Sequence, residues 1–111
     1  MISVLSLDQF QKIVQQDQAS LFYFSHEQCN VCKVLRPKIE TELTRDYPRL
    51  KQYYCDIHLY PEISAQNSVF AVPTILIFFE GLEYLRFSRH ISLEILHDKI
   101  NRPYQLLFDN D

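Results

Sequence analysis

The chain has 111 residues, a length that we expect to form one domain, residues 1–111, with a core that needs no disulfide staples. Its net charge of −3 disfavours nucleic-acid binding, because affinity for phosphate depends on clustered Lys and Arg. Its apolar stretches are too short to cross a membrane, and residues 1–8 lack the basic region of a secretory signal. The odd count of three cysteines fits a reducing compartment, so we expect a cytoplasmic protein.

The first half of the chain alternates helical and strand patterns. Apolar residues at helical spacing, opened by the capping pair Ser6 and Gln9, predict a helix over about 7–17. The almost wholly apolar residues 20–25 predict a strand that is buried on both faces. An apolar residue at every fourth position then predicts a long helix over about 29–47.

The second half predicts three strands and two helices. The strands are expected at 50–57, 74–79 and 82–88, and a short helix at 61–67. Ser92 caps a last helix that runs through Ile100, and Pro103 is expected to stop it. With a possible N-terminal edge strand, this order predicts an α/β fold, a central mixed β-sheet flanked by helices on both faces.

Two cysteines lie where the strand 20–25 gives way to the long helix. A thiol in the first turn of a helix faces unpaired N–H groups and the positive end of the helix dipole, and both favour the thiolate. Two residues separate Cys29 from Cys32, so the sulfurs can meet within one turn, close into a disulfide and reopen. This placement predicts thiol–disulfide exchange.

A set of motifs in a fixed order extends this interpretation. Over residues 2–101 the chain resembles the thioredoxin family, and the resemblance rests on Cys29-Asn30-Val31-Cys32-Lys33, Pro37, Val72-Pro73-Thr74 and Gly81. A lone C-x-x-C pair is common by chance and in zinc sites, whereas this ordered set at strand–helix and loop–strand junctions is specific. The resemblance implies a thioredoxin-like fold, with about 102–111 as a C-terminal extension that we expect to pack on the sheet edge rather than on a partner.

The resemblance also implies how the residues act. Cys29 would be the exposed nucleophile that attacks a substrate disulfide, and Cys32 the sulfur that resolves the mixed disulfide. A cis peptide bond is implied before Pro73, since only an X–Pro bond adopts cis at low cost. Val72 would then expose its N–H and C=O, so that an extended substrate binds along Val72, Pro73 and Thr74. The alternative is an ordinary trans proline that opens a strand.

The activity implied by the resemblance is that of a thiol–disulfide oxidoreductase that reduces protein disulfides without a cofactor. The implied partners are disulfide-containing protein substrates and, as electron donor, a reductase or a low-molecular-weight thiol. No nucleic acid, membrane or metal is expected at the site, and the protein is expected to be a monomer.

Near the cysteines the chain departs from the family pattern. Gln28 stands where the family has Trp, which removes a flat apolar wall beside the nucleophile, and Asn30-Val31 replace Gly-Pro. The changed dipeptide alters the balance between dithiol and disulfide. Tyr23 stands where the family has a buried Asp that helps to deprotonate the resolving thiol. A phenol, whose pKa is about 10, is a poor base at neutral pH.

One further segment departs from the family pattern, and one histidine near the cysteines has two possible roles. The family's Gly before the last helix is replaced within Ser88-Arg89-His90, where bulk and charge are expected to narrow the substrate groove and favour acidic or smaller partners. His26 lies three residues before Cys29. It is either a cation that lowers the pKa of Cys29 or a solvated loop histidine.

Two rival functions remain open at this point. Cys29, Cys32, Cys55 and His58 have ligand types and a spacing that are acceptable for structural zinc, although Cys55 falls in a predicted strand and is equally a small buried hydrophobe. The other alternative keeps the fold without turnover, as an interaction or redox-sensing module. The departures at Gln28 and Tyr23 favour that alternative.

Overall fold

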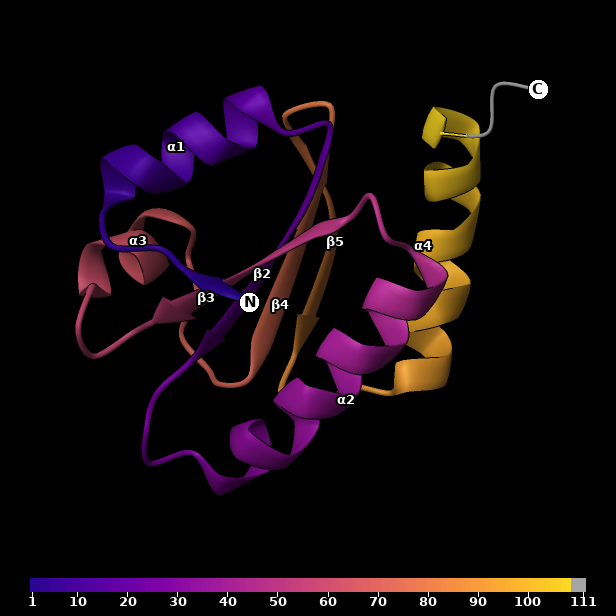
Figure 1. Cartoon of the computed structure of the whole chain (residues 1–111). Helices are drawn as coiled ribbons and strands as arrows, with labels where there is room; N and C mark the ends of the chain where they lie inside the picture. Colours follow the sequence, from indigo (N-terminus) through magenta and orange to yellow (C-terminus); the bar gives the residue numbers. More distant parts are fainter. Residues whose placement is uncertain (109–111) are drawn as a thin grey trace.

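Five strands form one mixed sheet in the order β1-β3-β2-β4-β5 in a computed structural model that describes residues 1–108 (Figure 1). The strand β2 pairs in parallel with β3 and antiparallel with β4, while β3 pairs in parallel with β1 and β4 antiparallel with β5. The predicted mixed sheet and its N-terminal edge strand are therefore confirmed. The strand bounds are β1 (Ile2–Ser3), β2 (Ala19–Ser25), β3 (Lys51–Asp56), β4 (Thr74–Phe79) and β5 (Leu82–Ser88).

Within residues 1–108, four helices cover the two faces of the sheet, with α1 and α3 on one face and α2 and α4 on the other (Figure 1). Each face has its own cluster of buried side chains, and β2 supplies both by the alternation of its residues. Phe22 and Phe24 pack under α1 and α3, whereas Leu21 and Tyr23 pack under α2 and α4. The helix bounds are α1 (Leu7–Gln16), α2 (Asn30–Asp46), α3 (Pro61–Gln66) and α4 (Leu93–Phe108). None of these helices in residues 1–108 is long and apolar enough to cross a lipid bilayer.

The last helix is longer than predicted. The expectation that it stops before Pro103 is wrong, because α4 continues through Pro103 to Phe108. A proline inside a helix costs about 3 kcal/mol, but burial of a large apolar side chain contributes roughly 2 kcal/mol. Beyond the proline, Tyr104 is buried, and Leu107 and Phe108 pack against the same core cluster. Together these three side chains offset the cost of the proline.

The predicted C-terminal extension is thus largely part of α4. It packs beside the end of α2. The ring of Tyr104 lies 4.9 Å from that of Tyr47, and the guanidinium of Arg49 lies 4.4 Å from the centre of the Phe108 ring. Residues 109–111, the end of the predicted extension, lie outside the described residues.

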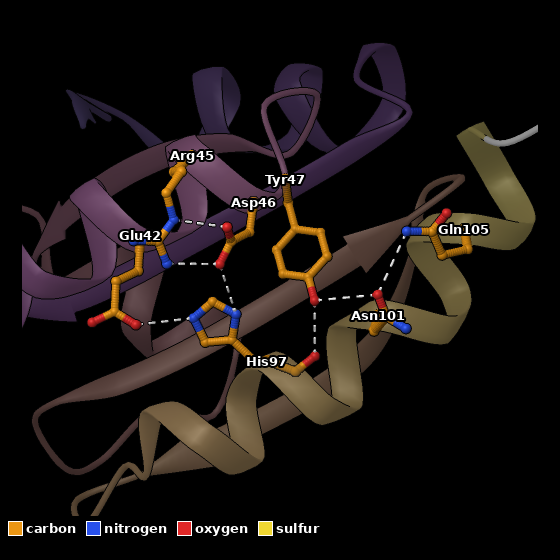
Figure 2. A network of polar contacts seen from close by, with 7 residues as sticks. All are labelled: Glu42, Arg45, Asp46, Tyr47, His97, Asn101 and Gln105. Atoms are coloured by element: carbon orange, nitrogen blue, oxygen red, sulfur yellow. Dashed lines mark hydrogen bonds and ion pairs between the residues drawn. The ribbon is translucent and has the colours of Figure 1, made fainter.

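A polar network fixes the C-terminal end of α2 to α4 (Figure 2). The hydroxyl of Tyr47 donates to the main-chain carbonyl of His97 over 3.1 Å, with the amide oxygen of Asn101 3.5 Å away. The imidazole of His97 lies between two carboxylates of α2, 3.1 Å from Glu42 and 3.4 Å from Asp46. These contacts join residues about fifty positions apart in the chain, so they lock the two helices together.

Candidate functional site

The candidate site begins at the N-terminal end of α2, where Cys29 and Cys32 form a disulfide. Their Cα atoms lie 5.3 Å apart, within the range that a disulfide requires. Cys29 is the N-cap of the helix, and its Sγ accepts a hydrogen bond from the backbone N–H of Cys32 over 3.3 Å. A sulfur at this position meets the unpaired N–H groups and the positive end of the helix dipole, which stabilise a thiolate. The predicted placement of the pair is confirmed.

The two sulfurs differ in their access to solvent. Cys29 is half-buried on the loop that follows β2, whereas Cys32 is 1 % exposed and belongs to the core cluster beneath α2. A tight turn sets this difference, because the N–H of Cys29 donates to the carbonyl of His26 and the N–H of Lys33 donates to the carbonyl of Cys29. The chain thus enters α2 with its first sulfur outward and its second sulfur inward.

The loop before β4 emerges at the same end of the sheet. Phe24, near the end of β2, pairs with Thr74 at the start of β4. The loop that leads to Cys29 and the loop that ends at Pro73 therefore lie at the same end of the sheet. The Val72–Pro73 peptide is cis, as predicted. Pro73 is buried and Val72 is half-buried.

Hydrogen bonds hold the cis-proline loop from two directions. The hydroxyl of Thr74 donates to the carbonyl of Ala71 over 2.6 Å and lies 3.1 Å from the hydroxyl of Ser88. The backbone N–H of Arg89 donates to the carbonyl of Pro73 over 2.7 Å. The end of β5 therefore fixes the loop that faces the cysteine end of the sheet, a contact that the sequence did not indicate.

Comparison with known proteins decides the family. The family model for thioredoxin matches residues 1–102 of this chain. The chain belongs to the thioredoxin family. As a member of that family it is a thiol–disulfide oxidoreductase, a protein-disulfide reductase whose redox-active pair is Cys29 and Cys32.

Individual thioredoxins and related proteins agree with this assignment. The chain is 31 % identical over 106 residues to the thioredoxin-like protein YdfQ of Bacillus subtilis, covering 96 % of this chain and 94 % of that protein. It is 31 % identical over 75 residues to thioredoxin-1 of Saccharomyces cerevisiae, covering 68 % and 72 % of the two chains. Among solved structures, Fasciola hepatica thioredoxin superimposes with a TM-score of 0.82 at 25 % identity, covering 92 % and 98 % of the two chains.

Tyr23, where the family resemblance implied a buried Asp, makes a structural contact with the second cysteine. Its ring is fully buried, and its hydroxyl donates to the main-chain carbonyl of Cys32 over 2.9 Å. Burial raises the pKa of Tyr23 well above its ordinary value, and the nearby Tyr54 raises that pKa further. The phenol therefore stays protonated, and it positions the backbone of Cys32 rather than removing its proton. The sequence indicated a poor base at this position but not this hydrogen bond.

His26 is half-buried in the loop before Cys29, and its ring makes two contacts there. Its ring stacks on that of His58, with the ring centres 4.2 Å apart and the planes 8° apart. Its Nδ1 accepts a hydrogen bond from the backbone N–H of Gln28 over 3.2 Å. His26 therefore stacks on His58 and supports the turn before Cys29. No sequence pattern links positions 26 and 58, so this pairing was missed.

The zinc alternative loses its ligands in the folded chain. Cys29 and Cys32 are bonded to each other, and Cys55 is 1 % exposed within β3, where burial raises the pKa of its thiol. Within residues 1–108, no three His, Cys, Asp or Glu side chains gather as a group that could hold a metal ion. Cys55 packs as a small buried hydrophobe in the cluster under α1 and α3.

Proposed function

We propose that this thioredoxin-family protein reduces disulfides of other proteins with Cys29 as the attacking sulfur and Cys32 as the resolving sulfur. The observation that carries the proposal is the difference between the two sulfurs. Cys29 is half-buried at the N-cap of α2, where it can reach a substrate, whereas Cys32 is 1 % exposed and can reach little but Cys29. A large partner therefore meets Cys29 first.

The reaction proceeds in two exchanges. The thiolate of Cys29 attacks one sulfur of a substrate disulfide, forms a mixed disulfide and releases the other substrate sulfur, which takes up a proton. Cys32 then loses its proton and attacks the Sγ of Cys29, which forms the Cys29–Cys32 disulfide and releases the second substrate thiol. Two electrons pass from the protein to the substrate. A reductase or a low-molecular-weight thiol then reduces the Cys29–Cys32 disulfide back to the dithiol. In this proposal the cycle uses no cofactor of this chain.

The substrate lies along Val72, Pro73 and Thr74 in this proposal. Within the described residues, no backbone hydrogen bond engages the N–H or C=O of Val72, whereas the carbonyl of Pro73 is bonded to Arg89. Free backbone groups beside the end of a strand suit an extended peptide that adds as a further strand. Such a peptide would run past the end of the sheet from which Cys29 also emerges.

The setting that we propose for this activity is the cytoplasm, with the chain acting as a monomer. The names of the relatives do not agree on a location, since one is a thioredoxin-like protein of Bacillus subtilis and another is a mitochondrial thioredoxin of yeast. The odd number of cysteines and the buried free thiol of Cys55 suit a reducing compartment. Fractionation of cells that express the tagged chain tests the location.

Reduction of insulin by dithiothreitol tests the proposed function. The wild-type protein is expected to accelerate the reduction, and Cys29→Ser is expected to abolish the acceleration. With dithiothreitol removed beforehand, the reduced Cys32→Ser variant is expected to accumulate a mixed disulfide with insulin through Cys29, visible by non-reducing electrophoresis and mass spectrometry. The conservative control Cys55→Ala removes a thiol outside the site. Absence of acceleration by the folded wild-type protein would favour the interaction or redox-sensing module instead.

A further inference from the structure

An open groove of about 790 Å³ borders the disulfide, between the first half of α2 and the segment that joins β5 to α4. Asn30 and Val31, the two residues between the cysteines, line it, so the groove begins beside the cysteine pair. Its α2 wall is apolar: Val31 is 64 % exposed and Val34 is 62 % exposed, and Leu35 lies beside them. Apolar side chains left open to water next to a reactive pair form a surface that a bound partner would cover.

The rim of this groove is positively charged. Lys38 from α2 and Arg89 from the opposite segment both line it, together with His90, and the described residues that line it include no Asp or Glu. No ion pair or hydrogen bond joins the charged groups of Lys38 and Arg89 to other residues in the described part of the chain. The protein as a whole carries a net charge of −3, so this local excess of cations runs against its overall balance. Its charge complement is a carboxylate.

The backbone of Arg89 has a conformation that is strained for a residue with a side chain. Arg89 has a φ of 66°, in the left-handed region. That region costs a residue with a Cβ about 1 kcal/mol and costs glycine almost nothing. Its N–H donates to the carbonyl of Pro73, so the same residue also fixes the cis-proline loop. A glycine would make that hydrogen bond with less strain, whereas the arginine adds a side chain that ends in a guanidinium at the groove.

We propose that the groove binds a segment of the substrate protein that carries an acidic side chain close to its disulfide cysteine, with the carboxylate facing Lys38 and Arg89 and an apolar neighbour of that residue against Val31 and Val34. The inference rests on the proposed function, because the occupant is the segment whose disulfide reaches Cys29. Lys38 and Arg89 are specificity residues that select among protein disulfides and take no part in the exchange of sulfurs.

The test uses three short peptides with one internal disulfide, identical except for Asp, Asn or Lys next to the same cysteine, with both termini blocked. The quantity measured is kcat/KM for reduction by the protein with dithiothreitol as donor. The wild type is expected to prefer the Asp peptide over the Lys peptide by about fivefold at low salt, since exposed ion pairs are individually weak. The preference is expected to shrink in 1 M salt, where charges are screened within about 3 Å.

Charge-altered variants connect the preference to the groove. Arg89→Glu is expected to turn the preference toward the Lys peptide, a reversal that general damage to the protein would not produce, and Arg89→Lys is expected to keep the wild-type order. Lys38→Gln is expected to weaken the preference roughly twofold. Val34→Ser is expected to lower kcat/KM for all three peptides alike. The matched control Lys99→Gln removes an exposed cation of α4 outside the groove and is expected to leave the preference unchanged.

The outcomes separate this inference from the function on which it rests. Equal kcat/KM for the three peptides in the wild type, or an unchanged order in Arg89→Glu, would overturn the inference while leaving the reductase activity intact. If neither the peptides nor insulin are reduced faster with the protein than without it, the proposed function itself fails, and the inference fails with it.

Discussion

The two ends of α2 differ in how they are held. At its C-terminal end, Asp46 and Tyr47 are tied to α4 through His97 (Figure 2). At its N-terminal end, Val31 is largely exposed, and the helix is capped by the sulfur of Cys29 instead of an oxygen. The C-terminal end of α2 is therefore fixed by contacts with α4, whereas its N-terminal end is open to solvent. Apolar side chains of α2 next to the disulfide, Val31 and Val34, are thus open to a partner, whereas the side chains at its C-terminal end contact α4.

The largest loss of stability is expected from a buried residue in the C-terminal half of α2. Leu43→Ala removes a fully buried side chain of α2 and is expected to lower the free energy of unfolding by about 3 kcal/mol. Val34→Ala, in the open half, removes an exposed side chain and is expected to change that free energy by less than about 0.5 kcal/mol. Urea unfolding of the oxidised proteins measures both. Similar losses for the two variants would contradict the contrast between the ends.

A comparable effect is expected at the end of α4, which braces the fixed half. Tyr104→Ala removes a buried ring and the hydroxyl that accepts a hydrogen bond from the backbone N–H of Arg49, and is expected to cost about 3 kcal/mol of unfolding free energy. Leu106→Ala, on the exposed side of the same turn, serves as the matched control and is expected to cost less than about 0.5 kcal/mol. An equally small loss for Tyr104→Ala would show that residues beyond Pro103 do not stabilise the domain.

A pair of tyrosine variants compares the two ends with the same chemical change. Tyr47→Phe and Tyr23→Phe each remove a hydroxyl that donates to a main-chain carbonyl, and each is expected to cost about 1 kcal/mol of unfolding free energy. Only Tyr23→Phe should also change the rate at which the mixed disulfide resolves, because its hydroxyl contacts Cys32. Stopped-flow reduction of a disulfide substrate measures that rate. A change in this rate for Tyr47→Phe alone would reverse the proposed division of roles.

The smallest effect concerns acid. Hydrogen bonds from Arg45 hold the pKa of Asp46 below its ordinary value, with its charge and that of His97 acting in the same direction. A carboxyl whose pKa is lower in the folded state stabilises the fold at pH values above its unfolded pKa of about 3.9. This contribution to the free energy of unfolding is lost as the pH falls through the folded pKa. Asp46→Asn should therefore flatten the acid side of the stability profile slightly. Urea midpoints from about pH 6 to pH 2 measure this, with Asp98→Asn as the control. A steeper acid side in Asp46→Asn would contradict the predicted sign.

What the sequence could predict follows from how local each signal is. The buried strand β2 and the cap of α2 at Cys29 depend on neighbouring residues, so the alternation of elements and the position of the cysteine pair were predicted correctly. The end of α4 depends on contacts of Tyr104 with α2, more than fifty residues earlier in the chain, and a local rule for Pro103 gave the wrong boundary.

The same limit applies within the site. The cis peptide at Pro73 follows a motif and was predicted, but the stacking of His26 on His58 joins segments that only the fold brings together. The hydrogen bond from Arg89 to Pro73 and the groove beside it are of the same kind. The resemblance marked Pro73 as a match and Arg89 as a departure, but only the folded chain shows that the two residues are in contact.

The most direct test of the central claim is the order in which the reduced cysteines react. Brief treatment of the fully reduced protein with iodoacetamide near neutral pH, followed by mass spectrometry of its peptides, reports each thiol separately. We predict that Cys29 is alkylated first, with Cys32 and Cys55 protected, because only Cys29 is both accessible and placed at the helix N-terminus. Alkylation of Cys32 before Cys29, or of both at the same rate, would contradict the assignment of attacking and resolving sulfur.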